Sequence, residues 1–359
     1  MRKRKFISVT SEVLRDYITR VLYAVGCDHE VVKIAAEVFL EADMRGVGFQ
    51  GIDHMHTLIS AVRNGHIDPK GLPRVVTNTA AYVLIDGNRG LGQPAAVLAA
   101  DLTIAKARET GICCAGIANS SDIFMLGFYA ERIARAGLVG FIFTGAPPSV
   151  HPHGGIERIL GTNPFAIAFP TADENPILID MATSAVSNSY LRQAAYYDED
   201  IPEHVGVDAQ GKSTKSAHAV RNGGAIAPLA GHKGFALSLV VALLAGPLIG
   251  AQTGKAMNGW RSDNKGPQGN YGHFLLAIDP ACFGDPQHFR NATSAFLDEI
   301  RSSRRAPGVA EIRIPGSRSF RTRERSMREG VRICDAVWEK FALLASSLGV
   351  QVPEAREAA

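Results

Sequence analysis

The chain has 359 residues, of which 46% are hydrophobic and 20% are charged, and its formal net charge is +3 at pH 7. Such a composition is ordinary for a soluble globular protein, and the length predicts two subdomains or one large α/β unit. Basic residues do not form a stripe interleaved with aromatic residues, which argues against nucleic-acid binding. The five cysteines have no CxxC spacing, so we expect no metal site and a reducing, cytoplasmic environment.

The first eighty residues carry helical patterns. A helix is predicted from Thr10 or Ser11 to about residue 24, a second helix follows Asp28, and a third covers about residues 55–63. A loop punctuated by glycines, residues 43–51, separates the second helix from the third. No apolar run follows the basic N-terminus, so the pattern does not predict a secretory signal.

From about residue 80 strands and helices alternate. Strands are expected at 82–85, 112–118, 139–144, 165–169, 176–179 and 273–278, and helices at 94–110, 127–136 and 289–301. A further strand is expected at 311–314 and a closing helix at 331–348. Residues 195–225 are polar and weakly patterned, which predicts a flexible flap. The most apolar stretch, residues 235–251, is short for a membrane span and contains Pro247, so we expect a buried helix and no membrane partner.

Several loops have compositions typical of ligand sites. Residues 151–164 combine two histidines, a Gly-Gly pair and a Thr-Asn-Pro turn, although an ordinary long loop explains them as well. Residues 231–234, Gly-His-Lys-Gly, precede a helix and favour a phosphate, although exposed lysines at helix starts are common. Asp180 follows an apolar strand and could orient a ligand or cap the next segment. The glycines at 87, 90 and 92 do not have the G-x-G-x-x-G spacing of a dinucleotide fingerprint.

Taken together, the segments 90–93, 119–120, 146–150, 154–164, 180–184, 232–234, 272–280 and 315–316 resemble the non-Rossmann malate/L-lactate dehydrogenase family. This family includes sulfolactate, ureidoglycolate and diketogulonate enzymes and the piperideine/pyrroline-2-carboxylate reductases. The resemblance covers nearly the whole chain. It implies an α/β (α+β) fold with a large mixed, mostly antiparallel sheet that binds the cofactor without a Rossmann fold, and a helical layer built from both chain ends.

The resemblance also implies a function and a division of labour. We expect an NAD(P)-dependent oxidoreductase that acts on a 2-oxo acid, a 2-hydroxy acid or a cyclic imino acid, and a homodimer. Residues 1–80 and 285–359 would form the helical, dimerisation and substrate-side domain, and residues 81–284 the cofactor domain. The cofactor contacts implied by the resemblance are Thr144, Gly145, Ala146, Asp180, Met181, Ala182, Thr183, Ser184, His232, Lys233, Gly316 and Arg318.

The substrate loops depart from the family pattern. Family members usually carry Ser-His-Gly after Arg-Gly-Val, with the histidine as a proposed proton donor, whereas this chain has Gln50 there. A second family histidine, after Asn-Ser-x, is replaced by Asp122, and a family arginine falls approximately at His54, with Asp53 beside it. These positions, Gln50, His54 and Asp122, are the candidate catalytic residues.

The replacements change the chemistry that the site can do. An amide such as that of Gln50 orients an oxygen but does not exchange a proton at neutral pH, whereas His54 titrates in the right range. Asp122 acts as an acid only if its pKa is raised, and with Asp53 it suits a cationic substrate such as a protonated imine. The alternative is a non-catalytic protein that binds the cofactor. Arg318 is a candidate for the 2′-phosphate of NADP, but NAD is the preferred expectation.

Overall fold

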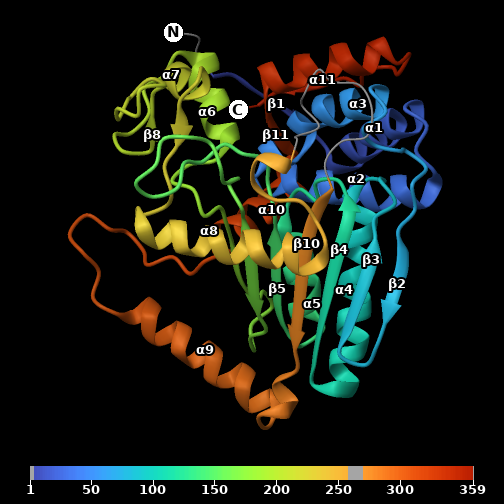
Figure 1. Cartoon of the computed structure of the whole chain (residues 1–359), viewed down its shortest axis with the longest axis vertical. Helices are drawn as coiled ribbons and strands as arrows, with labels where there is room; N and C mark the ends of the chain where they lie inside the picture. Colours follow the sequence, from blue (N-terminus) through green and yellow to red (C-terminus); the bar gives the residue numbers. More distant parts are fainter. Residues whose placement is uncertain (1–3, 258–269, 359) are drawn as a thin grey trace.

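A seven-stranded sheet forms the centre of the chain, whose computed structural model describes residues 4–257 and 270–358 (Figure 1). The strand order is β2-β3-β4-β10-β5-β6-β7. The strands are β2 (Arg74–Asn78), β3 (Tyr82–Asp86), β4 (Ile112–Ser120), β5 (Val139–Thr144), β6 (Phe165–Phe169), β7 (Ile177–Met181) and β10 (Tyr271–Ile278). The strands β3 and β4 are parallel and the other neighbours are antiparallel, which confirms the predicted mixed, mostly antiparallel sheet.

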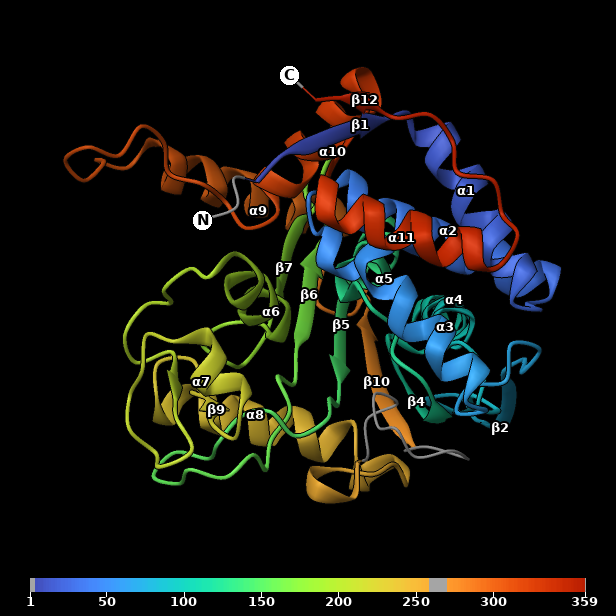
Figure 2. The same ribbon diagram turned by 90° about the horizontal axis from the view of Figure 1, so that it is seen from above.

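Helices from both chain ends pack together, as predicted. They are α1 (Ser11–Ala24), α2 (His29–Met44) and α3 (Met55–Arg63) from the N-terminal part, and α10 (Ser317–Glu329) and α11 (Asp335–Ser347) from the C-terminal part. The ring of Tyr17 in α1 lies 5.5 Å from Trp338 and 4.8 Å from Phe341, both in α11. Two further helices, α4 (Gly92–Thr110) and α5 (Leu126–Arg135), lie between these helices and the sheet (Figure 2).

One continuous hydrophobic cluster joins the terminal helices to the sheet. It includes Leu14 of α1, Phe39 of α2, Ile117 of β4 and Phe341 of α11. The strand β2 joins the sheet before residue 80. The hydrophobic core is therefore continuous across the predicted boundary between the helical domain and the cofactor domain. The division into these two domains stays a prediction about function.

The C-terminal strand β11 (Val331–Cys334) corrects the prediction of one helix over 331–348, because α11 starts only at Asp335. This strand pairs with β1 (Phe6–Val9), which also pairs with β12 (Arg356–Glu357). Val331 and Ile333 are buried and Arg332 between them is exposed, so the segment has the period of two that a half-buried strand requires. The same apolar residues also fit a helical stripe, which is why periodicity alone did not separate the two.

Residues 188–226 form a small unit with its own core, so regular elements occupy the segment 195–225, which the sequence predicted to be a flexible flap. It contains α6 (Asn188–Tyr197), β8 (Gly206–Val207), α7 (Ala217–Arg221) and β9 (Ala225–Ile226). Leu191, Ile201 and Val220 belong to a second hydrophobic cluster, separate from the main one. The elements are short, and their contacts join residues that are far apart within the segment. No local sequence pattern therefore predicts them.

The apolar helix α8 (His232–Leu244) is not buried as predicted. Only Gly234, Ser238, Val241 and Ala242 are buried, whereas Leu243 is 58% exposed. Residues 232–249 are long and apolar enough to cross a membrane by length and composition alone, and 33% of them are buried. The regular helix has 13 residues, about 20 Å at 1.5 Å each, which is shorter than a hydrocarbon core of about 30 Å. Gly246 then turns the chain into η3 (Pro247–Ile249) and η4 (Gly254–Ala256).

The helix α9 (Pro286–Ser302), which follows η5 (Pro280–Cys282), projects from the body and is followed by an extended segment (Figure 1). Leu297 is its only buried residue. The strand predicted at 311–314 does not form. This segment passes the edge of β7, where the Leu178 amide donates to the carbonyl of Pro315 at 3.4 Å, and it makes no ladder.

The glycines at 87, 90 and 92 lie in a tight turn. Their spacing had already differed from that of a dinucleotide fingerprint. Asn88 and Arg89 have positive φ angles of 50° and 55°. A side chain on Gly90 would overlap the carbonyl of Gly71, and one on Gly92 would overlap the carbonyl of Ser121. The close approach of backbone atoms is enough to require glycine at these positions, so a bound phosphate is not needed to explain them.

Candidate active site

One end of the sheet brings together the segments that the sequence had placed near a cofactor. The strands β4, β5 and β7 end there, at Ser120, Thr144 and Met181, while β6 and β10 begin there. The register aligns Tyr271 with Ser120, His273 with Thr144 and Phe165 with Met181. The residue sets 119–122, 144–146, 162–165 and 180–184 therefore share one edge of the sheet.

Asn163 holds this edge together. Its Oδ1 accepts a hydrogen bond from the Ala146 amide at 3.2 Å, and its Nδ2 donates to Oγ of Ser238 in α8 at 3.0 Å. Thr183 donates from its backbone amide to the carbonyl of Thr162 and from its hydroxyl to the carbonyl of Asn163. Asn163 has a φ of 36°, in the left-handed region that asparagine tolerates. The Thr-Asn-Pro turn is thus a structural anchor.

Asp43 shapes the loop that carries Gln50 and His54. This loop consists of η1 (Gly48–Gln50) and η2 (Ile52–His54). The carboxylate of Asp43 accepts the Ile52 amide at 2.9 Å, and a Cβ on Gly51 would stand 2.3 Å from that carboxylate. Burial and the nearby Asp53 raise the pKa of Asp43 well above its usual range. The Gly48 to His54 turn is therefore wrapped around one buried acid.

The two loops that carry the candidate catalytic residues lie against each other. His54 is buried, and its ring packs edge-on against Phe124 with the centroids 5.5 Å apart. Phe124 follows Asp122 by two residues, and its amide donates to Asp122 Oδ1 at 2.8 Å. The φ of Phe124 is 62°, a conformation that a bulky residue rarely adopts. The structure thus brings His54 and the Asp122 turn together.

His54 has a defined hydrogen-bonding direction. Its Nδ1 bonds to the carbonyl oxygen of Phe49. Since a carbonyl oxygen only accepts, Nδ1 carries the hydrogen, and the ring exchanges a second proton through Nε2. The side-chain Oε1 of Gln50, in the same turn, is buried and has no hydrogen-bond partner among the residues described. An acceptor without a partner at this place suits a ligand that offers an N–H or O–H.

Arg192 is a further candidate site residue, which sequence reasoning missed. It projects from α6, and its Nη2 lies 2.5 Å from Asp53 Oδ2 and 3.2 Å from Ser189 Oγ. Its side chain is 26% exposed, whereas that of Asp53 is 8% exposed. Asp53 is therefore engaged in an ion pair, which corrects the expectation that it would face a cationic substrate. The pair joins the small unit to the substrate loop, a contact across 139 positions that no local signal reveals.

Asp180 caps a helix that is distant in sequence. Its Oδ2 accepts the amide of Gly127, in the first turn of α5, at 2.7 Å. Desolvation by the surrounding protein raises the pKa of Asp180 to about 6, against the opposing effects of that hydrogen bond and of Arg45. The capping alternative is thus correct in kind, although the capped helix is α5 and not the segment that follows Asp180.

The start of α8 has the features of an anion site. His232 and Lys233 are exposed, and the ring of His153 lies 5.9 Å from that of His232. Among the residues described, no acceptor takes the amides of His232 and Lys233, and no carboxylate pairs with Lys233. The Leu229 amide donates to the carbonyl of Thr183 and so ties this helix start to the 180–184 segment. His151, in contrast, bonds to Pro152 through Nδ1 while its buried Nε2 lacks a described partner.

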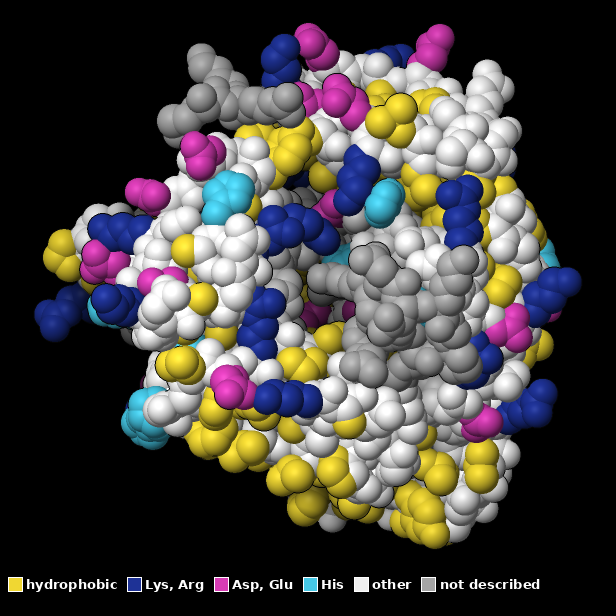
Figure 3. Space-filling view, turned by 45° about the horizontal axis from the view of Figure 1, so that its top comes forward, with side chains coloured by type: hydrophobic (Ala, Val, Ile, Leu, Met, Phe, Trp, Pro, Cys, Tyr) yellow, Lys and Arg dark blue, Asp and Glu magenta, His cyan; other side chains and the backbone are white. Residues whose placement is uncertain are grey.

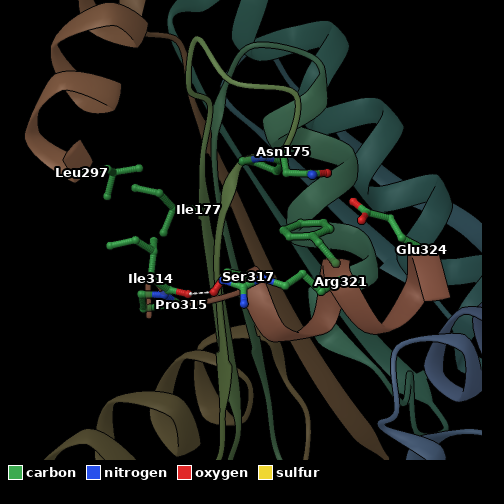
Figure 4. Close-up of a pocket in the computed structure, with 10 residues that line it drawn as sticks. Asn175, Ile177, Leu297, Ile314, Pro315, Ser317, Arg321 and Glu324 are labelled. Carbon is green, nitrogen blue, oxygen red and sulfur yellow. Dashed lines mark hydrogen bonds between the residues drawn. The ribbon is translucent and has the colours of Figure 1, made fainter. Parts of the chain in front are cut away.

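Gly316 and Arg318 lie beside β7 at the start of α10. Gly316 has a φ of 92°, and an added Cβ would stand 3.1 Å from backbone atoms of Leu178, so close packing on β7 already explains the glycine. A cavity of about 170 Å³ adjoins it (Figure 4). Its lining includes Ile177, Leu297, Ile314, Ser317 and Arg321. Arg318 is exposed, does not line this cavity and has no ion pair among the described residues.

The candidate residues fall into two groups. Gln50, His54 and Asp122 lie in two touching loops, and the 144–146, 180–184 and 232–233 segments are linked through Asn163 and Leu229. The space-filling view shows a hollow on the face that Figure 3 presents, with Lys, Arg and His side chains around it. Within the described ranges, no group of three or more His, Cys, Asp and Glu residues has the arrangement of a metal site.

Comparison with known proteins gives a consistent result over the whole chain. The family model described as malate/L-lactate dehydrogenase matches residues 9–342. The malate dehydrogenase of Pyrococcus horikoshii is 36% identical over 353 residues, which cover 96% of this chain and 97% of that protein. The Delta(1)-pyrroline-2-carboxylate/Delta(1)-piperideine-2-carboxylate reductase of Pseudomonas syringae is 34% identical over 339 residues, 94% of this chain and 96% of the reductase. The solved structure of the Pyrococcus horikoshii enzyme aligns with a TM-score of 0.89 at 35% identity, with 97% of each chain covered.

Proposed function

The chain belongs to the malate/L-lactate dehydrogenase family, and we propose that it transfers a hydride between a nicotinamide cofactor and a small cyclic imino acid or 2-oxo acid. Relatives are named for hydroxy acids and for cyclic imino acids, so family membership leaves the substrate open. The observation that carries the proposal is the contact of His54 with the Asp122 turn. It places the turn that carries His54 and the buried Gln50 Oε1 against the turn that carries Asp122.

The residues present suit a nicotinamide dinucleotide. The start of α8 offers two amides without described acceptors and the ammonium of Lys233, a combination that favours phosphate oxygens. The Thr144–Ala146 and Asp180–Ser184 segments adjoin it through Leu229 and Asn163. Lys233 would hold the pyrophosphate, and the segments at the sheet edge would hold the rest. When bound, the cofactor supplies or accepts the hydride.

The substrate loops supply hydrogen bonds and a proton. Reduction of a ketone places a hydride on carbon and a proton on oxygen, and His54 Nε2 would deliver that proton. A protonated imine already carries its proton on nitrogen, so its reduction requires only the hydride. The N–H of such an imine would donate to Gln50 Oε1, and Asp122 would balance its positive charge. The replacement of both family histidines therefore favours a cyclic imino acid as the substrate.

Arg192 would bind the carboxylate that these substrates share. One of its nitrogens is engaged by Asp53 and Ser189, and a guanidinium has five N–H donors, so others remain for an anion. A guanidinium matches a carboxylate with two parallel hydrogen bonds. Asp53 would hold Arg192 in position over the turn that carries Gln50.

The activity is tested with a panel of 2-oxo acids, sugar-derived oxo acids and five- and six-membered cyclic imino acids, each with NADH and with NADPH. We expect turnover with at least one cyclic imino acid, measured as the loss of absorbance at the reduced-nicotinamide wavelength. Cofactor fluorescence measures binding separately. Binding without turnover on every substrate would support a non-catalytic binding protein, and no binding of either cofactor would refute the oxidoreductase proposal.

We propose NAD as the cofactor. A 2′-phosphate usually requires an arginine or lysine close to the adenosine ribose, and Arg318 at the start of α10 is the candidate for that role. If NAD is preferred, Arg318→Ala leaves the NADH dissociation constant within about twofold and NADPH binding stays weak in both proteins. A loss of tight NADPH binding in the variant would assign the chain to NADP.

We propose a homodimer that covers α8 and α9, so that its interface extends beyond the dimerisation domain expected at 1–80 and 285–359. Exposed apolar residues gather on these two helices and around them: Leu237, Leu239, Val240, Leu243, Leu248, Phe283 and Phe296. Monomeric proteins rarely expose apolar patches of this kind. Light scattering should give twice the chain mass, and Leu243→Glu should halve it, whereas the same change at the exposed Leu343 of α11 should not. A wild-type chain that stays monomeric at micromolar concentration would refute the dimer.

We propose a cytoplasmic location because the cysteines form no disulfide bonds. All five, Cys27, Cys113, Cys114, Cys282 and Cys334, are free. Free thiols in this number are typical of a reducing compartment. Cell fractionation with a tagged protein would test the location.

A further inference from the structure

His273 occupies the centre of the sheet edge on which the site is built. It lies on β10 and pairs with Thr144 of β5 on one side and Ile117 of β4 on the other. Its side chain has no exposed surface. Both ring nitrogens nevertheless have partners: Nδ1 lies 2.5 Å from Thr144 Oγ1, and Nε2 lies 2.9 Å from the carbonyl oxygen of Ser121.

The partners determine where the hydrogen of the ring is. The carbonyl oxygen of Ser121 only accepts, so Nε2 carries the hydrogen and donates it. In the neutral ring Nδ1 then accepts, and the hydroxyl of Thr144 donates to it at 2.5 Å in preference to the Gly145 carbonyl at 3.3 Å. Complete burial lowers the pKa of His273 to about 4, so the ring stays neutral at physiological pH. Each nitrogen therefore has a fixed and different role.

The two partners belong to the two halves of the site. Ser121 directly precedes Asp122, in the turn that contacts His54, and Thr144 is the first residue of the 144–146 cofactor segment. We propose that His273 is a positioning residue that sets these halves against each other, with Nε2 fixing the Asp122 turn and Nδ1 fixing the Thr144 hydroxyl. This inference rests on the proposed function, since it assigns one half to the substrate and the other to the cofactor.

The backbone shows why such a link is needed. Asn119 and Phe124, on either side of Asp122, have φ angles of 51° and 62°. A turn with two residues in the left-handed region persists only if its surroundings hold it. The hydroxyl of Ser121 is buried without a described partner, so the Ser121 side chain does not hold the turn. Other groups hold this turn: the Tyr129 hydroxyl donates to the Ile123 carbonyl at 2.8 Å, the Asn119 side-chain amide donates to Asp86 at 2.7 Å, and both Ser120 Oγ and His273 Nε2 donate to the Ser121 carbonyl. Of these bonds, the one from His273 also connects the turn to Thr144.

Two substitutions separate the two hydrogen bonds. His273→Asn places an amide oxygen near the position of Nδ1 and keeps a partner for Thr144, but it does not reach Ser121. His273→Gln places an amide nitrogen near the position of Nε2 and keeps the donor to Ser121, but it leaves Thr144 without an acceptor. His273→Phe keeps the ring and removes both bonds, and so serves as the matched control.

The readouts are the NADH dissociation constant, from fluorescence, and kcat and KM for the best substrate of the panel. We expect His273→Asn to lower kcat/KM about tenfold with NADH binding unchanged, and His273→Gln to weaken NADH binding about fivefold with a smaller change in kcat at saturating cofactor. His273→Phe should show both losses. Equal effects of the Asn and Gln variants on both readouts, or no effect of either, would overturn the proposal.

Substitutions of Thr144 provide a second test, which examines the same hydrogen bond from its other partner. Thr144→Val removes the hydroxyl and should weaken NADH binding as His273→Gln does, whereas Thr144→Ser should not. On the His273→Gln background, Thr144→Val should add less than about twofold, because the hydroxyl acts through the same bond. Full additivity would overturn the link. If a histidine variant does not fold, equal NADH binding by Thr144→Val and Thr144→Ser overturns the proposal, and the expected difference between them supports it.

The wild-type protein separates failure of this inference from failure of the proposed function. Absence of turnover and of cofactor binding in the wild type refutes the oxidoreductase proposal itself. If the wild type turns over substrate but the Asn and Gln variants change the NADH dissociation constant and kcat/KM equally, only the role of His273 is refuted.

Discussion

The proposed cofactor side and substrate side of the site are held together differently. Segments 144–146, 162–164 and 180–184 are joined by strand pairing and backbone bonds, such as that from the Thr183 amide to the Thr162 carbonyl, together with the side chains of Asn163 and Thr183. The substrate loops are joined through side chains: Asp43 to the Ile52 amide, Arg192 to Asp53, and His54 to Phe124.

We propose that this difference is related to the departures of the substrate loops from the family pattern. Backbone bonds of the sheet depend weakly on side-chain identity but require the strand register and a few special residues such as Asn163. Side-chain contacts change with each substitution, so the substrate half would accommodate Gln50 and Asp122 without a change in the cofactor half. The comparison predicts that substitutions on one side leave the other side's binding constant unaltered.

The largest effect is expected at Asp43. Asp43→Ala removes the acceptor of the Ile52 amide and empties the space inside the turn, so kcat/KM should fall about 100-fold, as expected when catalytic groups shift by an ångström. The folded state should lose about 3 kcal/mol from the unpaired amide and the cavity together. Asp43→Asn, which keeps an oxygen acceptor for the Ile52 amide, should stay within about threefold. Steady-state kinetics and thermal unfolding measure both, and wild-type kinetics in the Ala variant would refute the assignment.

Arg192 should affect the substrate and not the cofactor. Arg192→Gln should raise KM by about tenfold to a hundredfold, the size expected for losing a charged hydrogen bond to a carboxylate, with NADH binding unchanged. The control Arg221→Gln, at an exposed position on α7, should be silent. Asp53→Asn, which breaks the ion pair but keeps Arg192, should have the smaller effect. If Asp53→Asn raised KM as much as Arg192→Gln, the pair would act only structurally.

Lys233 should affect the cofactor and not the substrate. Lys233→Ala should weaken NADH binding roughly tenfold, because a charge-assisted bond to a phosphate is lost. KM for the substrate at saturating NADH should not change, and Lys212→Ala, on an exposed loop, should match the wild type in both. An unaltered NADH dissociation constant in the Lys233 variant would remove the start of α8 from the cofactor site.

The smallest effect is a pH dependence of stability at Asp180. Its pKa is about 6 in the folded state against an ordinary value of 3.8, so between these values the unfolded chain releases a proton that the folded chain retains. The folded state is therefore favoured at the low end, and its stability falls as the pH rises through about 4 to 6. Asp180→Asn should flatten that part of the curve, measured by urea unfolding without cofactor. An identical slope in the variant would contradict the raised pKa.

Local sequence patterns identified most elements of the main core. The helix α1 begins after Thr10, whose hydroxyl accepts the Val13 amide, and β5 and β6 have the predicted bounds. Two of the failures share one cause: β11 and the unit at 188–226 owe their structure to partners far away in the chain, β1 and the second hydrophobic cluster. A short segment with two or three apolar residues fits a helix, a strand or a loop equally until its partner is known.

The candidate site divides in the same way. Gln50, His54 and Asp122 were identified from their positions in loops that resemble a family, and the sheet register then placed the cofactor segments at one edge. Arg192, Asp43 and His273 were missed as site residues because each acts through a contact between distant segments. A lone arginine, aspartate or histidine carries no local sign of such a contact.

The sequence by itself determined the kind of protein, namely the mixed sheet, the helical layer from both ends and the family, and it predicted which loops carry the substrate chemistry. The tertiary structure decided how those loops work, because it pairs Asp53 with Arg192, wraps the Gln50 turn around Asp43 and joins Ser121 to Thr144 through His273. The physical reason is that periodicity and turn chemistry report interactions within about one turn or strand, whereas a buried polar group takes its role from whichever partner the fold brings to it.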